Sequence, residues 1–249
     1  MSNFLNALRL IYHRISKKNK YPFTYQENGV LFRVNNAIEE FRLVNWGGEK
    51  DYVLEMISNL KSDDIFYDIG SSVGLFSIHA ANKLSNGKVI SFEPDPENQK
   101  CLEKNYKLNK LSNYKLMPIA VGEHLDKLEL FTSGSNGFSP SLKKVNGIES
   151  SILVDVNSID NLIVGKEIPL PTVIKIDIEG AEFIALKGMK NLLASKEKPR
   201  ILFIELHPEF LPSFNTTVDE ILKFMQQFEY SISENLTRDK QILCKFEKM

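Results

Sequence analysis

Four apolar segments of the chain end at a side chain that could do chemistry. They are Ile65–Tyr67 before Asp68, Val89–Phe92 before Glu93, Val173–Ile176 before Asp177, and Ile201–Leu206, which contains Glu205 and precedes His207. Each segment has the length and composition of a buried strand. In an open parallel sheet the carboxyl ends of the strands share one edge, and ligands bind there where the strand order reverses. The pattern therefore predicts one pocket lined by carboxylates.

The turn after the first segment indicates which ligand that pocket takes. The spacing Asp68-x-Gly70-x-x-x-Gly74 differs from the G-x-G-x-x-G of dinucleotide folds, and Leu75 stands where a P-loop has its lysine. Asp68 would repel a phosphate but attract a cation. Glu93 can accept both hydroxyl protons of a ribose. S-adenosylmethionine has a ribose, a cationic sulfonium and no phosphate, so it fits these features. The alternative is a tight turn in an ordinary α/β domain.

The elements that position these residues alternate between strand and helix, which indicates a parallel sheet with helices on both faces. An Asn28-Gly29 hairpin is expected before the sheet and another hairpin after it. Beyond the four strands we expect helices near 50–60, 73–84, 96–108, 181–194 and 216–228, strands at 114–121, 126–132 and 151–156, and hairpin strands at 23–26 with 30–34 and 230–233 with 241–246. We divide the chain into an N-terminal helix and hairpin extension, residues 1–48, and a main domain, residues 49–249.

The N-terminal segment has the pattern of an amphipathic basic helix. Apolar residues recur at helical spacing from Phe4 to Ile15, with lysines and arginines interspersed or following. Such a helix either packs on the domain or a second subunit, or lies on an anionic membrane surface. A homodimer and a peripheral membrane contact therefore both stay open. A glycine- and serine-rich segment, Ser133–Ser141, is either a mobile loop or a lid over the acceptor.

Composition is that of a globular protein with a balanced charge. The 249 residues are 43% hydrophobic and 25% charged, which suits one large domain with a sizeable core. The formal net charge of −1 provides no basic field, so we expect no nucleic-acid partner. Cys101 and Cys244 lack metal-ligand spacing and are expected to be thiols in a reducing compartment. Since no apolar stretch approaches the roughly 20 residues of a membrane span, we expect a cytoplasmic protein.

Several short segments resemble the FkbM family of S-adenosylmethionine-dependent methyltransferases. The most specific is the block Lys175–Glu182, which reads K-I-D-I-E-G-A-E; the others are Asp68–Gly74, Phe92–Pro94, Ala120–Gly122, Leu186–Gly188 and Glu205–His207. The resemblance covers roughly residues 49–208. It implies a class I, Rossmann-like methyltransferase fold, with a mostly parallel seven-stranded sheet and an antiparallel C-terminal strand. Members of the family mostly methylate hydroxyl oxygens, often on sugars or polyketides.

The same resemblance implies a set of cofactor contacts. The glycine turn would contribute Asp68, Gly70, Ser71, Ser72 and Gly74 at the methionine end, Glu93 would hold the ribose, and Pro94, Ala120 and Val121 would surround the adenine. The family commonly has alanine and asparagine where this chain has Ser71 and Ser72. A serine hydroxyl still forms hydrogen bonds but lacks the paired groups of an amide, so contacts to the cofactor carboxylate are expected to differ in detail.

Methyl transfer to a hydroxyl depends on alignment and on a nearby base. The catalytic candidates are Asp177, His207 and Glu179, and the first two lead because both follow strand ends. The alternative for His207 is a structural cap before Pro208. These three residues and Glu205 could also ligate a divalent cation, but their spacing does not require one, and we assign no metal.

Our hypothesis is an O-methyltransferase that uses S-adenosylmethionine and acts on a hydroxyl of a sugar or of another glycan-pathway intermediate. The alternatives are a methyltransferase for a lipid or a small non-sugar metabolite, and a non-catalytic cofactor-binding protein. A nicotinamide-dependent oxidoreductase is disfavoured by the spacing of the glycine turn.

Overall fold

A computed structural model describes residues 20–46, 49–132, 140–143, 150–238 and 240–249. The expected amphipathic helix at Phe4–Ile15 lies outside the described residues, and so does most of the segment Ser133–Ser141. Within the described ranges, none of the helices combines the length and the apolar composition that crossing a membrane requires.

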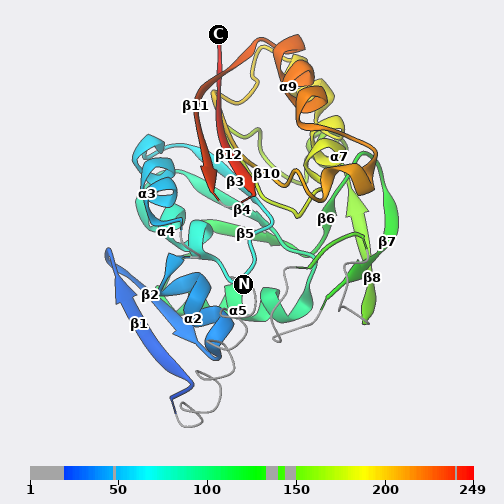
Figure 1. The fold of residues 1–249 in the computed structure, drawn as a ribbon. Helices are drawn as coiled ribbons and strands as arrows, with labels where there is room; N and C mark the ends of the chain where they lie inside the picture. Colours follow the sequence, from blue (N-terminus) through cyan, green and yellow to red (C-terminus); the bar gives the residue numbers. More distant parts are fainter. Residues whose placement is uncertain (1–19, 47–48, 133–139, 144–149, 239) are drawn as a thin grey trace.

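A mixed seven-stranded sheet forms the centre of the molecule (Figure 1). Its order is β11-β12-β10-β9-β3-β4-β5, and the last five of these strands are parallel to one another. β12 lies antiparallel to both β10 and β11, which confirms the expected antiparallel C-terminal hairpin. The strands are β3 (Ile65–Ile69), β4 (Lys88–Phe92), β5 (Tyr114–Met117), β9 (Val173–Ile176), β10 (Ile201–Leu206), β11 (Tyr230–Arg238) and β12 (Gln241–Lys248).

Helices cover both faces of this sheet because successive strand residues point to opposite sides. On one face, Phe66, Val89 and Phe203 pack with α3 (Lys50–Asn59), α4 (Leu75–Lys83) and α5 (Pro96–Leu108). On the other face, Tyr67, Ile90 and Leu202 pack with α6 (Ile159–Val164), α7 (Glu182–Lys187), α8 (Lys190–Ala194) and α9 (Val218–Gln227). Figure 1 shows α3 and α4 on one side of the sheet and α7 and α9 on the other. The two faces therefore hold separate hydrophobic cores.

The N-terminal hairpin forms as the Asn28-Gly29 signal predicts. Both turn residues have positive φ, 50° and 79°, between β1 (Phe23–Glu27) and β2 (Val30–Val34). Side chains of α5 bind the backbone of β2, since Asn105 Oδ1 accepts from Arg33 N at 2.8 Å. The buried residues of β2 belong to the core under α3, α4 and α5. The division of the chain at residue 48 stays a prediction.

Two expected elements are each broken into two. The expected strand 114–121 is interrupted at Pro118, which has no N–H to donate to a neighbouring strand. The second half of that strand, β6 (Ala120–Val121), joins a separate small sheet with β8 (Ser151–Asn157) and β7 (Asp126–Phe131). The expected helix 181–194 ends at Gly188, which lies against the carbonyl oxygen of Gly122, and restarts as α8, where Asp160 accepts from Asn191 N and Leu192 N. The sequence pattern does not predict α6, and it does not predict α2 (Ala37–Leu43), which precedes α3 in the chain.

Candidate active site

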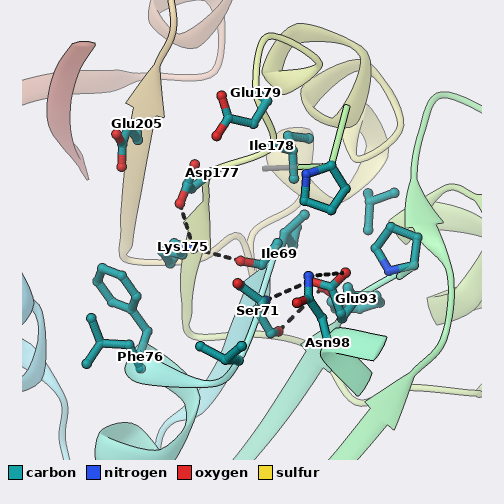
Figure 2. A pocket seen from close by; sticks show the side chains of 18 of the residues that line it. Ile69, Ser71, Phe76, Glu93, Asn98, Lys175, Asp177, Ile178, Glu179 and Glu205 are labelled. Carbon is teal, nitrogen blue, oxygen red and sulfur yellow. Dashed lines mark hydrogen bonds and ion pairs between the residues drawn. The ribbon is translucent and has the colours of Figure 1, made fainter. Parts of the chain in front are cut away.

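A cavity of about 270 Å³ opens at the carboxyl ends of β3, β4 and β9 (Figure 2). This is where the sheet order reverses, because β3 lies between β4, which follows it in the chain, and β9, which comes about a hundred residues later. Crevices at such switch points are the usual ligand sites of open α/β sheets. The four acidic strand ends do converge here, as the sequence predicts, although their side chains do not all face the cavity.

The glycine turn after β3 is shaped by a close approach of two loops. Gly70 has φ +82°, and a β-carbon there would lie 1.9 Å from the carbonyl oxygen of Asp177. The N–H groups of Gly70 and Ser71 both donate to Phe92 O at 3.0 Å, which joins the turn to the end of β4. Only glycine therefore lets the ends of β3, β4 and β9 meet this tightly.

Glu93 is held on the cavity wall by backbone donors from both sides. Its Oε2 accepts from Ser72 N at 2.7 Å, and its Oε1 accepts from Asp95 N at 2.9 Å. The side chain of Asn98 approaches the same Oε1 at 3.4 Å. Burial raises the pKa of Glu93 to about 7, although these N–H donors oppose the shift. The carboxylate is thus oriented in advance, and further hydroxyl donors from a ligand would stabilise its charged form.

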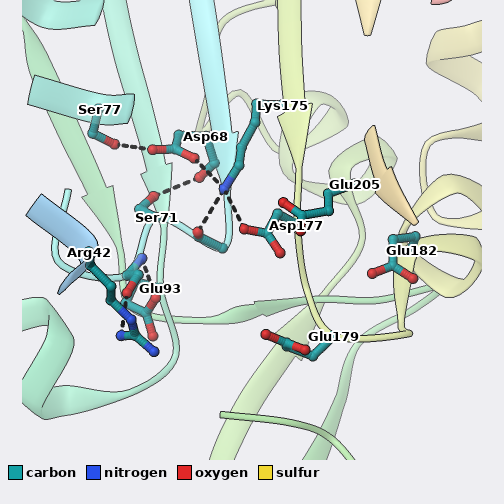
Figure 3. Close-up of polar contacts among 12 residues, drawn as sticks. Arg42, Asp68, Ser71, Ser77, Glu93, Lys175, Asp177, Glu179, Glu182 and Glu205 are labelled. Carbon is teal, nitrogen blue, oxygen red and sulfur yellow. Dashed lines mark hydrogen bonds and ion pairs between the residues drawn. The ribbon is translucent and has the colours of Figure 1, made fainter. Parts of the chain in front are cut away.

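Lys175 is the buried cation that joins the two acidic strands. Its Nζ lies 3.0 Å from Gly70 O, 3.4 Å from Asp68 Oδ1 and 3.3 Å from Asp177 Oδ2 (Figure 3). Burial alone would lower the pKa of Lys175, but the charges of Asp177 and Asp68 raise it above its usual value. The ring of Phe76 lies 4.7 Å from Nζ. Lys175 therefore fixes the glycine turn and neutralises part of the acidic cluster.

Asp68 lies beneath the cavity instead of on its wall. Its side chain is fully buried, with Oδ2 accepting from Ser77 Oγ at 2.5 Å and Oδ1 facing Lys175. Of the two, Lys175 lines the cavity and Asp68 does not, so the direct contact of Asp68 with the cofactor stays a prediction. Gly74, with φ +99°, caps α4 and also stays off the wall.

His207 is a buried histidine surrounded by carboxylates. Its Nδ1 lies 2.8 Å from Glu182 Oε1, and its Nε2 faces Glu179, Asp177 and Glu205. Burial lowers the pKa of His207, but the hydrogen bond and the charge of Glu182 outweigh burial and, with Asp177 and Glu179, raise it to about 10. Burial raises the pKa of Asp177, but the positive charges of Lys175 and His207 lower it by more, so the net shift is downward. His207 does not line the cavity, so it is not placed as a free neutral base.

The structure brings most of the predicted site residues onto the cavity wall. Those that line it are Gly70, Ser71, Ser72, Glu93, Pro94, Ala120, Val121, Asp177 and Glu179. Sequence reasoning missed the roles of Lys175 and Arg42. The Nη1 of Arg42 donates to Ser72 Oγ at 2.8 Å. A lysine inside the apolar strand β9 was a usable signal, since a buried charge needs a partner. Arg42 comes from α2, and its local sequence carries no such signal.

Comparisons with known proteins agree with this fold. The model of the methyltransferase FkbM domain matches residues 68–232, more than half of the chain. The chain is 30% identical over 181 residues to the hexuronic acid methyltransferase AglP of Haloferax volcanii, covering 71% of this chain and 70% of AglP. Fold and site thus define a class I methyltransferase. The chain belongs to the FkbM family, whose members take their methyl group from S-adenosylmethionine, and S-adenosylmethionine is the cofactor here.

Solved structures support the fold alone. The methyltransferase FkbM from Methylobacillus flagellatus KT superposes with a TM-score of 0.50 at 24% identity, over 76% of this chain and 45% of that one. A tRNA methyltransferase from M. jannaschii superposes with a TM-score of 0.50 at 15% identity, over 93% of this chain and 58% of that one. This chain thus spans less than two thirds of each of these structures.

Proposed function

We propose that the protein is an O-methyltransferase that acts on a hydroxyl of a sugar in a glycan-pathway intermediate. The observation that carries the sugar acceptor is the 30% identity to the hexuronic acid methyltransferase AglP, which extends over 70% of that protein. A hexuronic acid presents hydroxyls beside a carboxylate, so an enzyme for it needs hydrogen-bond acceptors at one end of the substrate and charge compensation at the other.

We place the ribose of the cofactor at Glu93, where the carboxylate is oriented by Ser72 N and Asp95 N and faces the cavity. Pro94, Ala120 and Val121 supply apolar surface for the adenine next to it. The turn from Gly70 to Ser72 supports the methionine end. This placement leaves the sulfonium near the acidic side of the cavity, where opposite charges attract.

We assign the contact with the acceptor to Asp177 and Glu179, which both line the cavity. In the transfer step, an oxygen lone pair of the acceptor forms a bond to the methyl carbon while the carbon–sulfur bond breaks. The electrons of that bond stay on sulfur and give S-adenosylhomocysteine, and the hydroxyl proton passes to Asp177 or Glu179. His207 lies behind these carboxylates and positions them. Alignment of the two reactants supplies the main part of the rate, about 7–11 kcal/mol of the barrier.

The test is a transfer assay with isotopically labelled cofactor and a panel of acceptors: sugar nucleotides with and without a hexuronic acid, lipid-linked glycans, and small non-sugar alcohols. We expect an O-methylated sugar as the product, identified by mass spectrometry. Asp177→Asn should lower turnover by about 10²–10⁴-fold, whereas the matched change Asp126→Asn, at an exposed position in β7, should not. Transfer only to lipids or non-sugar alcohols would show that the sugar acceptor is wrong. Cofactor turnover that no acceptor increases would favour a non-catalytic binding protein.

A further inference from the structure

The carboxylates behind the cavity surround His207 on two sides. On one side, Glu182 Oε1 lies 2.8 Å from Nδ1; on the other side, Nε2 faces Glu179 Oε2 at 3.6 Å and both Asp177 Oδ1 and Glu205 Oε1 at 3.8 Å. The histidine side chain is only 2% exposed. Figure 3 shows Asp177 and Glu205 side by side at the ends of neighbouring strands. The Nε2 atom of the ring thus points toward three carboxylates.

The contact with Glu182 determines which nitrogen of the ring is available. Glu182 is fully buried at the start of α7, and its Oε1 also accepts from Gly180 N at 2.9 Å. A carboxylate fixed in this way accepts the Nδ1 proton of the ring, so Nε2 is the nitrogen left to ligate a cation, which would displace the Nε2 proton. Histidines that ligate a metal are held by the same arrangement, with the second ring nitrogen donating to a carboxylate or a carbonyl.

Nε2 itself has no hydrogen-bond partner among the described residues, although it is buried. The three carboxylates lie at ion-pair distance from Nε2, 3.6–3.8 Å, but none is within hydrogen-bond distance of this buried nitrogen. The separations from Nε2 lie between the adjacent and the opposite ligand distances of a shared cation. Ligands at about 2.1 Å from one octahedral ion lie about 3.0 Å apart when adjacent and about 4.2 Å apart when opposite. One ligand atom each of Asp177, Glu205 and His207 lie within 4.8 Å of one another, so a small inward rotation closes the set.

We propose that Asp177, Glu205 and His207 bind a divalent cation at the inner edge of the cavity, with Glu179 next to it. One imidazole with carboxylate oxygens suits a cation of the Mn²⁺ type. Asp177 can contact both Lys175 and the cation, because its Oδ2 faces Lys175 at 3.3 Å while its Oδ1 faces His207. The sequence spacing gave no reason to assign a metal, since the donors come from two strands and only the sheet brings them together.

The cation gives the site a means of holding the acceptor, and this part of the inference rests on the proposed function. Asp177, Glu179 and Glu205 line the cavity, so a cation between them can take an acceptor oxygen as a further ligand. A hydroxyl next to a carboxylate, as in a hexuronic acid, can chelate such an ion through both groups. Coordination lowers the pKa of a bound hydroxyl and so favours its attack on the methyl carbon.

The test measures cation binding without cofactor or acceptor. Full-length protein is stripped with a chelator and titrated with Mn²⁺, with free Mn²⁺ followed by its paramagnetic resonance signal. We expect one saturable Mn²⁺ per chain, and affinity reduced at least tenfold in His207→Gln and in Glu205→Gln. His124→Gln, a change at an exposed histidine, is the matched control and should bind as the original chain does. Circular dichroism establishes that each variant is folded.

A spectroscopic signature keeps the inference testable should a variant fail to fold. Pulsed electron resonance on the Mn²⁺ complex of the unmodified chain should show coupling to an imidazole nitrogen, and absence of that coupling would overturn the assignment. Lack of saturable Mn²⁺ binding in a preparation that still binds S-adenosylmethionine would overturn the cation site and leave methyl transfer intact; His207 would then be a protonated partner of the carboxylates. Mn²⁺ binding in a preparation that methylates no sugar would support the cation site and contradict the sugar acceptor.

Discussion

Replacing Lys175 by methionine tests how the acidic strand ends are held together. The change keeps most of the side-chain volume but removes the charge that lies 3.4 Å from Asp68 and 3.3 Å from Asp177. Asp68 is fully buried and the lysine side chain is 3% exposed, so water cannot replace the lost partner. Removing one member of a buried ion pair costs about 3–5 kcal/mol, because the other member is left as an uncompensated charge. That is a large share of the 5–15 kcal/mol that stabilises an ordinary domain.

Equilibrium unfolding in urea, followed by circular dichroism, measures this cost. With a slope of about 3 kcal/mol/M for a chain of this size, the midpoint should fall by about 1–2 M. Lys187→Met is the matched control, since Lys187 pairs with Glu123 at 3.3 Å but is 37% exposed; its cost should be about 0–1 kcal/mol. Adding Asp68→Asn to Lys175→Met should restore part of the lost stability, because the unpaired carboxylate is gone. A loss below about 1 kcal/mol in Lys175→Met, or a double variant weaker still, would refute the reasoning.

Two further predictions concern the cofactor contact and the fold. Burial raises the pKa of Glu93 to about 7, and only its carboxylate form can accept from both ribose hydroxyls at once. Cofactor affinity should therefore fall about tenfold per pH unit below 6 and level off above 8. Calorimetry that shows no pH dependence would contradict this. Gly188→Ala should lower the free energy of unfolding by at least about 2 kcal/mol, because its β-carbon would lie 1.9 Å from Gly122 O. Gly165→Ala, where the nearest atom is at 3.3 Å, should cost less than 1 kcal/mol in the same urea unfolding experiment.

Much of the scaffold could be predicted because its signals are local. Apolar runs bounded by turns define β3, β4, β9 and β10, and Asn28-Gly29 defines the first hairpin. The breaks at Pro118 and Gly188 were harder to anticipate. At the second, Gly188 lies against the carbonyl of Gly122, a distant segment that only the folded chain brings close.

The site was predictable to the extent that strand ends converge, and Glu93 lies on the cavity wall for that reason. The direction of each side chain was not predictable. Asp68 turns toward Lys175 and Ser77 because a buried cation and a hydroxyl are available there. His207 turns toward Glu182, which lies 25 positions earlier in the chain. Both orientations depend on partners that sequence spacing does not reveal.

The central claim is that S-adenosylmethionine binds across the end of β4 with its ribose on Glu93. Calorimetric titration of the cofactor into the unmodified chain and into Glu93→Ala tests it most directly. Loss of two charge-assisted hydrogen bonds should cost about 3 kcal/mol, or about a 10²-fold weaker affinity. Glu97→Ala, at an exposed glutamate of α5 that pairs with Lys100, should bind as tightly as the unmodified chain. An affinity of Glu93→Ala within threefold of the unmodified chain would contradict the account.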